Sequence, residues 1–300
     1  MQPSSLAQPQ LTYYTALDRS TWLERRELHR SRVLAWVEDR VTRANRATKH
    51  PVYDFLFTYY SFRPAHLLRW SPGVDVELLD ITQHELDWPL DFTRTERGYV
   101  IPADSFPAQR RTYLSWALNY LTQIESRPGT FCCFGLHEWA MVYKSQAPRH
   151  SQVSLRLSGE RIAQVVEESE LRCTHYDAYR FFTPEATPRN RSLLSRRTTT
   201  EFDQPGCIHV TMDLYKFAHK IAPWCPSELV ADTFILAADA RAIDMRASPY
   251  DLSEYGFKAI EIETASGRSE YITEQRALSE RAAPLRKDLI NVYSELIKRI

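Results

Sequence analysis

Three separate segments of the sequence each combine a histidine with a carboxylic acid in an apolar, aromatic setting. The pairs are His137 with Glu138, His175 with Asp177, and His209 with Asp213. A histidine beside a carboxylate can transfer protons, or the two can serve as ligands of a metal ion. We predict that at least two of these pairs share one polar site. In the alternative, each pair is a separate hydrogen-bonded part of the core.

The segment 171–184 holds the most side chains that could do chemistry, with a histidine, an aspartate, two arginines and four aromatic residues. If this segment begins as a strand, alternate side chains share a face. Cys173, His175 and Asp177 would then point the same way. This spacing predicts that His175 and Asp177 act together.

The third segment has the periodicity of a helix that begins near Ile208. A helix there would place His209, Asp213 and Lys216 along one side, at spacings of four and three residues. The sequence therefore predicts that this side of the helix faces the site.

Two chemistries fit these pairs. In one, Asp213 or Asp177 stabilises an oxocarbenium-like sugar or activates water while a nucleobase stacks on aromatic side chains, as cleavage of an N-glycosidic bond requires. In the other, His137, His175 and His209 bind zinc or iron, which activates water or oxygen. A third possibility is a helical binding protein without catalysis, in which the pairs are purely structural.

Standard catalytic motifs are missing from the sequence. His137-Glu138 begins like the zinc motif H-E-x-x-H, but Met141 stands where the second histidine ligand belongs. There is also no G-x-S-x-G, no G-x-G-x-x-G and no P-loop. These absences argue against a zincin, a serine hydrolase, a Rossmann dehydrogenase and a kinase.

The charge of the chain is balanced, with 38 basic and 38 acidic side chains. This argues against a protein that coats nucleic acid by overall charge, although a local basic face is compatible with it. The candidates for phosphate contacts are an arginine-rich helix predicted over 21–46 and a long loop over 189–197.

Cysteine usage and the N-terminal sequence favour a cytoplasmic protein. The 5 cysteines form no C-x-x-C, and the first residues contain no basic and apolar signal region. The most apolar later run, 229–242, is interrupted by Asp232 and Asp239, so no membrane span is predicted.

Helical periodicity dominates the chain and predicts one mainly helical domain over 18–300, after a loosely ordered tail over 1–17. Weak alternation within 74–104 and a strand-like run at 257–264 predict a small β element in which these short strands pair. Apolar positions from Leu278 onward predict a last helix that Pro284 starts or kinks.

Five stretches of the sequence carry a resemblance to known proteins. They are 50–60 (HPVYDFLFTYY), 69–73 (RWSPG), 135–139 (GLHEW), 173–183 (CTHYDAYRFFT) and 204–216 (QPGCIHVTMDLYK). Together they resemble a group of bacterial proteins named 3-methyladenine DNA glycosylase, and the resemblance runs from about residue 20 to the C-terminus. The helix-hairpin-helix with a glycine-rich turn and a following catalytic aspartate, found in the helical alkyladenine glycosylases, does not occur in this chain.

The resemblance implies a hydrolase that removes alkylated bases from DNA as part of DNA repair, without a cofactor. Under this hypothesis Asp213 and Asp177 are the catalytic carboxylates, and His175 and His209 orient or protonate the substrate. His137 and Glu138 complete the candidate catalytic residues. The candidate substrate-binding residues are Tyr176, Tyr179, Arg180, Phe182, Tyr59, Tyr60 and Lys216. The alternative hypothesis is a metal-dependent hydrolase or oxygenase that acts on a small molecule, with zinc or iron on the three histidines.

Overall fold

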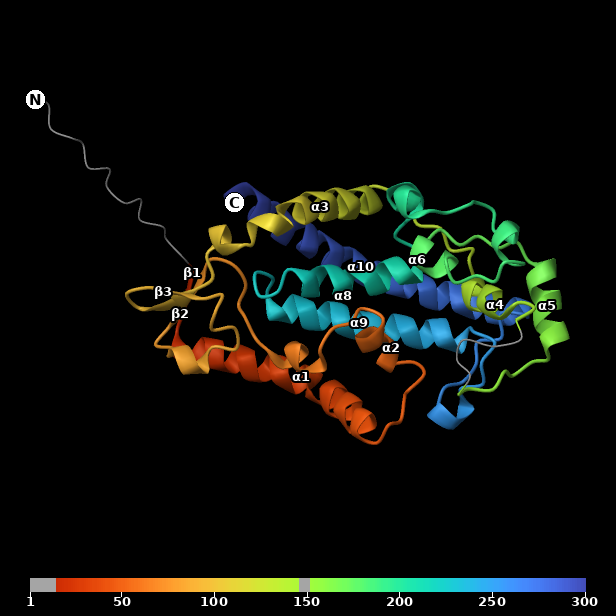
Figure 1. Cartoon of the computed structure of the whole chain (residues 1–300), viewed down its shortest axis with the longest axis horizontal. Coiled ribbons are helices and arrows are strands. Elements are labelled where there is room, and N and C mark those ends of the chain that lie inside the picture. The colour runs from red at the N-terminus through yellow and green to blue at the C-terminus, as the bar shows by residue number, and fades with distance from the viewer. Residues whose placement is uncertain (1–14, 146–151) are drawn as a thin grey trace, which may run out of the picture.

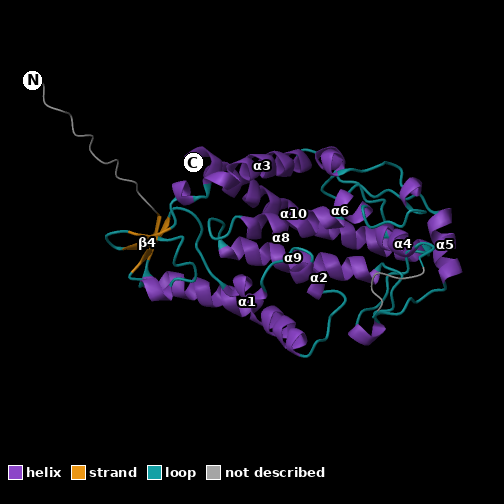
Figure 2. Cartoon of the chain, viewed as in Figure 1, coloured by secondary structure: helices purple, strands orange, loops and turns teal. Residues whose placement is uncertain are grey.

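The computed structural model describes residues 15–145 and 152–300, which form a helical body with a small sheet at one end (Figures 1 and 2). The helices are α1 (Arg19–Asn45), α2 (Asp54–Thr58), α3 (Arg111–Glu125), α4 (Leu136–Val142), α5 (Gly159–Glu168), α6 (Tyr176–Tyr179), α7 (Thr199–Phe202), α8 (Ile208–Lys220), α9 (Ser227–Arg246) and α10 (Ala265–Arg299). The strands are β1 (Thr15–Leu17), β2 (Val76–Leu79), β3 (Thr93–Arg94) and β4 (Gly98–Val100). The predicted fold class, mainly helical with a small β element, is confirmed.

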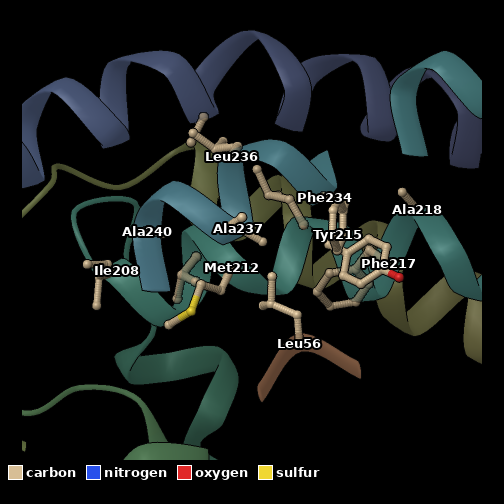
Figure 3. Packing of buried hydrophobic residues seen from close by; sticks show 14 of the residues in the cluster. Leu56, Ile208, Met212, Tyr215, Phe217, Ala218, Phe234, Leu236, Ala237 and Ala240 are labelled. Atoms are coloured by element: carbon tan, nitrogen blue, oxygen red, sulfur yellow. The ribbon is translucent and has the colours of Figure 1, made fainter. Parts of the chain in front are cut away.

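Helices α8 and α9 form the centre of the molecule and lie side by side (Figure 1). α9 is buried on most of its sides, and most of its buried residues are apolar. Phe234 of α9 packs edge-on against Tyr215 of α8, with 5.1 Å between ring centroids, and Leu56 of α2 lies in the same cluster (Figure 3). Each such side chain contributes about 1.5–3 kcal/mol by burial. The packing therefore fixes α8 and α9 firmly against each other.

The connection between these two helices is short, spanning only 221–226. Two helices joined in this way form an antiparallel hairpin. The first turn of α8 consequently lies beside the last turns of α9, which brings together residues that are far apart in the sequence.

Helix α10 covers α3, α8 and α9 along much of the length of the molecule. It begins at Ala265, where the Thr264 side chain accepts a hydrogen bond from the Gly267 N–H, and Pro284 lies inside it. The prediction that the last helix starts near Leu278 was therefore wrong about its beginning. None of the helices within the described ranges is long and apolar enough to cross a membrane.

The sheet has the strand order β1-β2-β4-β3, and β1 is parallel to β2 while the other pairs are antiparallel. The strands expected within 74–104 are present. Residues 257–264 form no strand, and β1 takes the edge position instead. Ile260 and Ile262 are buried, and the Ile260 N–H donates to the Arg246 carbonyl, so side-chain packing and the end of α9 hold this segment in place.

β1 also corrects the expected tail, because its residues belong to the 1–17 segment that was predicted to be loosely ordered. The Trp22 indole of α1 donates to the Leu79 carbonyl of β2 over 2.9 Å, which anchors the helix that follows β1 to the sheet. The rest of the tail, 1–14, lies outside the described residues.

The last turn of α8 carries a histidine whose pKa predicts a pH-dependent stability. His219 stacks on Phe62 with 3.8 Å between ring centroids, and burial, aided by the charge of His66, lowers its pKa to about 4. In the unfolded chain, His219 has the ordinary histidine pKa of about 6.5. The contribution of neutral His219 to stability is thus fully present above about pH 6.5 and is lost as the pH falls toward 4. When the pH is lowered from 7 to 5, we expect the free energy of unfolding to fall by about 1–2 kcal/mol less in His219→Gln than in the parent.

Urea unfolding at the two pH values measures this difference for the parent and the variant. The exposed His84 provides a matched control, and His84→Gln should lose stability as the parent does. Equal losses in the parent and in His219→Gln would contradict the assignment.

Candidate active site

The structure brings the three candidate histidines into one row. His137 comes from α4, His175 from the residue before α6, and His209 from the first turn of α8. The His209 ring lies between the other two, with ring-centroid distances of 4.5 Å to His137 and 5.3 Å to His175. His137 and His175 are buried and His209 is half-buried. Three distant segments therefore meet at one polar centre.

The two outer histidines are each held by a carboxylate that the sequence analysis did not select. His137 Nε2 lies 2.7 Å from Asp244 Oδ1, and His175 Nδ1 lies 3.1 Å from Asp203 Oδ1. The Tyr120 hydroxyl donates to the second oxygen of Asp203 over 2.5 Å. Both carboxylates are completely buried, so these bonds fix the orientation of the two rings.

His137 and Glu138 stand next to each other in the sequence but bind different partners. Adjacent residues of a helix diverge by about 100°, and Glu138 turns to Arg241, whose guanidinium lies 2.8 Å from it. The same guanidinium donates to Asp244 over 2.6 Å. Arg241 thus joins Glu138 and Asp244 in one buried ionic network behind His137.

The prediction that His175 and Asp177 act together on one face of a strand is wrong, because the chain becomes helical directly after His175. The Tyr179 N–H donates to the His175 carbonyl, which closes the first turn of α6. Asp177 therefore lies on another face and pairs with Arg180 over 3.0 Å, with a third of its side chain exposed. Cys173, His175 and Asp177 share no strand face.

Helix α8 begins at Ile208 as predicted and carries Asp213 toward Tyr60 and Lys216. The Tyr60 hydroxyl donates to Asp213 over 2.9 Å, and the Lys216 ammonium pairs with the other carboxylate oxygen. Burial alone would raise the pKa of Asp213, but Lys216, the charge of His175 and the hydrogen bonds outweigh it and lower the pKa. Asp213 is therefore ionised, and its hydrogen-bond and ionic partners are Tyr60 and Lys216.

The protonation states along the row of histidines differ. Burial, together with the charges of His137 and His175, lowers the pKa of His209 well below its ordinary value. Burial would also lower the pKa of His175, but the charge and hydrogen bond of Asp203 raise it instead. A neutral imidazole with a free lone pair therefore lies at the centre of the row, where it can accept a proton or bind a metal ion.

One ligand atom from each of His137, His209 and Asp244 lies within 4.8 Å of the others. No ligand atom of His175 belongs to this group. Among the described residues, the potential ligand atoms that lie close together thus come from two histidines and one carboxylate, whereas the sequence analysis named three histidines.

A cleft of about 740 Å³ opens near this centre, between α2, α6 and the end of α8. We call it the basic cleft, and its charged and aromatic lining residues are Arg40, Lys49, Arg180, Arg196, Lys216, Lys220, Asp54, Asp177, His50, Phe55, Tyr59, Tyr60, Phe62 and Phe181. A separate cavity of about 20 Å³ is lined by His209 and Arg241, among other residues. Phe55, Tyr59, Asp177 and Phe181 line both spaces, so the cavity beside His209 is a neighbour of the cleft.

Of the predicted substrate-binding residues, Tyr59, Tyr60, Arg180 and Lys216 line the basic cleft. The other three do not line it; they are Tyr176, Tyr179 and Phe182. Tyr179 and Phe182 are buried and pack against each other at 5.2 Å between ring centroids, and Tyr176 packs against the core. The α6 turn directs Phe181 into the cleft in their place.

The two arginine-rich segments contribute less to the cleft than expected. Most arginines of the 21–46 helix are bound to carboxylates, as Arg25 is to Glu228 and Arg30 to Asp87, and only Arg40 lines the cleft. In the 189–197 loop, only Arg196 lines it. The predicted phosphate-binding surfaces are therefore reduced to one residue each at this cleft.

The segments that lead into α4 and α8 are joined by one side chain. Gln204 Oε1 accepts hydrogen bonds from the Thr130 N–H over 2.8 Å and from the Gly206 N–H over 2.7 Å. A Cβ on Gly206 would lie 2.5 Å from the Thr130 carbonyl oxygen, so only glycine fits. We call this arrangement the Gln204 clasp.

The residues that the sequence analysis missed are Asp244, Arg241 and Asp203. Arg241 and Asp244 had a recognisable signal, because they stand three residues apart in a helix that is otherwise largely apolar and must pair when buried. Asp203 had none, because nothing in its spacing indicates Tyr120 or His175 as partners.

Comparison with known proteins found no match to this chain. The chain matches no protein-family model, no curated protein and no solved structure. The resemblance to the bacterial 3-methyladenine DNA glycosylase group consequently stays a prediction.

Proposed function

We propose that the protein hydrolyses the N-glycosyl bond of alkylated bases in DNA, and that the damaged nucleotide enters the basic cleft beside Asp177. One observation carries this proposal: the cleft combines cations, aromatic rings and a solvent-accessible carboxylate in a space of about 740 Å³. Ligand sites typically occupy about 300–1,000 Å³, so one nucleotide unit fits.

The cations support binding of a phosphate backbone. Lys49, Arg196 and Lys220 are exposed, and within 15–145 and 152–300 no carboxylate forms a salt bridge with any of them. In a chain without net charge, three such cations around one cleft concentrate positive potential where a phosphate would lie.

The aromatic side chains support binding of a base that has left the duplex. Phe55 and Tyr59 are stacked at 4.8 Å between centroids, and Phe181 lines the cleft near them. Stacking of a base on such rings contributes about 1–3 kcal/mol and accepts any base. Selectivity for damage would then come from the ease with which an alkylated base leaves the duplex.

The chemistry requires a carboxylate near the sugar. A purine that is alkylated at a ring nitrogen other than the one bonded to the sugar carries a positive charge. When the C1′–N bond breaks, its electron pair stays with the purine, which leaves as a neutral base. Positive charge develops on the sugar, where the Asp177 carboxylate stabilises it and takes a proton from the attacking water. The water oxygen forms the new bond to C1′, which leaves an abasic sugar. Asp213 acts indirectly, by holding Tyr60 and Lys216 on the cleft wall.

Base release from a methylated duplex tests the proposal. Incubation of the full chain with alkylated DNA should liberate free methylated purines, detected by chromatography, and abasic sites in equal number. The undamaged duplex should release no base. Absence of release under conditions in which the protein binds the duplex would refute the proposed activity.

The role of the cleft cations is tested by removing them together. The triple variant Lys49→Gln, Arg196→Gln, Lys220→Gln should lower the slope of log affinity for DNA against log salt by about two to three. The matched control replaces the exposed residues Arg94, Lys258 and Lys287, which lie outside the cleft. Equal effects of the two triple variants on this slope would show that DNA lies elsewhere.

A further inference from the structure

The group formed by His137, His209 and Asp244 has the geometry of a metal-ion site. Its three side chains come from α4, α8 and α9, and one ligand atom of each lies within 4.8 Å of the others. The closest pair, His137 Nε2 and Asp244 Oδ1, shares a hydrogen bond of 2.7 Å, and binding of an ion between them would release its proton to solvent. The rings of His137 and His209 meet at 75°, so they approach edge to face rather than in a stack.

The surroundings of Asp244 orient it as a ligand. One of its oxygens faces His137, while the other accepts from Arg241 over 2.6 Å. Arg241 is in turn bound to Glu138, so the carboxylate is held by a second layer of hydrogen bonds. Ligands of metal ions in proteins are typically fixed by such outer partners.

His209 is the member of the group that lines a cavity. Among the described residues, no hydrogen-bond partner is seen for the His209 ring, and the ring lines the small cavity next to the basic cleft. An ion held by three protein ligands would keep its further coordination positions for water or a substrate in this cavity.

We propose that His137, His209 and Asp244 bind one divalent transition-metal ion, either zinc or iron(II). Imidazole suits both ions, and two imidazoles with one carboxylate form a ligand set that is used for both. This inference rests on the ligand geometry and is independent of the proposed glycosylase activity.

Cobalt(II) is a suitable probe because it replaces both ions and reports its ligands through visible absorption bands. After removal of metals with a chelator, the full chain should bind about one cobalt ion per chain. In His209→Ala the bands should disappear, with binding at least about 100-fold weaker, since loss of even an outer partner costs about 10–100-fold. His209→Gln provides the same test if the alanine variant is unstable. Zinc and iron(II) titrations under anaerobic conditions then identify the preferred ion.

His175→Gln is the matched control, because His175 lies next to His209 but pairs with Asp203. It should bind cobalt as the parent does. Absence of binding to the parent, unchanged binding in His209→Ala, or equal loss in both variants would overturn the site. Base release is measured separately, so failure of either experiment leaves the other proposal standing.

Discussion

Replacement of Arg241 by methionine is expected to lower the free energy of unfolding by about 3–5 kcal/mol, the cost of breaking a buried ion pair. Arg241 is 1% exposed and donates to both Glu138 and Asp244. Methionine has a similar length and fills the space, but it leaves two carboxylates buried without their cation. Urea unfolding followed by circular dichroism measures the loss.

Arg281→Met is the matched control for this change. Arg281 of α10 pairs with Asp239, which lies in α9 as Arg241 does, but the two paired side chains are both about half exposed. Exposed pairs contribute about 0–1 kcal/mol, so this variant should stay close to the parent. Glu138→Gln and Asp244→Asn in the Arg241→Met background should recover part of the lost stability. Losses of similar size in Arg241→Met and Arg281→Met would contradict the ionic network.

Replacement of Asp177 by asparagine is expected to reduce the rate of base release by about 1,000-fold or more, within the range that proton transfer by one positioned group contributes. The side chain is one third exposed on the cleft wall, so the fold should be unchanged. Asparagine keeps the shape but neither takes a proton from water nor stabilises a cationic sugar. Single-turnover rates on alkylated DNA measure the effect, and affinity for the DNA should be nearly unaffected.

Asp213→Asn separates the two candidate carboxylates. Asparagine still accepts from Tyr60 but loses the ion pair with Lys216, so binding of DNA should weaken while base release falls less than in Asp177→Asn. The exposed Asp104 provides the neutral control, Asp104→Asn. Full activity of Asp177→Asn with a strong loss in Asp213→Asn would exchange the roles of the two residues.

The helical part of the site was predictable because it depends on local periodicity. The helix at Ile208 begins where the sequence indicated, and Asp213 and Lys216 pair across one turn as their spacing requires. The convergence of His137, His175 and His209 was also predicted, since histidines in apolar segments need polar neighbours.

The partners of these histidines were not predictable, because they come from distant segments. Spacing favoured Asp177 for His175, but the partner is Asp203, which is brought in by the chain that leads into α8. Likewise Asp244 reaches His137 only because α8 and α9 form a hairpin. Pairing between segments depends on tertiary packing, which no local pattern records.

The same reason explains the error in the sheet. Residues 257–264 have the composition of a strand, but the edge beside β2 is occupied by β1. Ile260 and Ile262 bury their side chains just as they would in a sheet, so hydrophobicity alone did not distinguish the two outcomes.

The Gln204 clasp has a consequence for how the site moves. It joins the chain near residue 130 to the chain near 206, only a few residues before His137 and His209. We therefore expect the thermal displacements of the two helix starts to be correlated, and the distance between the two rings to fluctuate less than either helix moves. In Gln204→Ala we expect the two helix starts to move independently. The nuclear magnetic resonance signals of the two imidazoles should then broaden, while the helices remain intact.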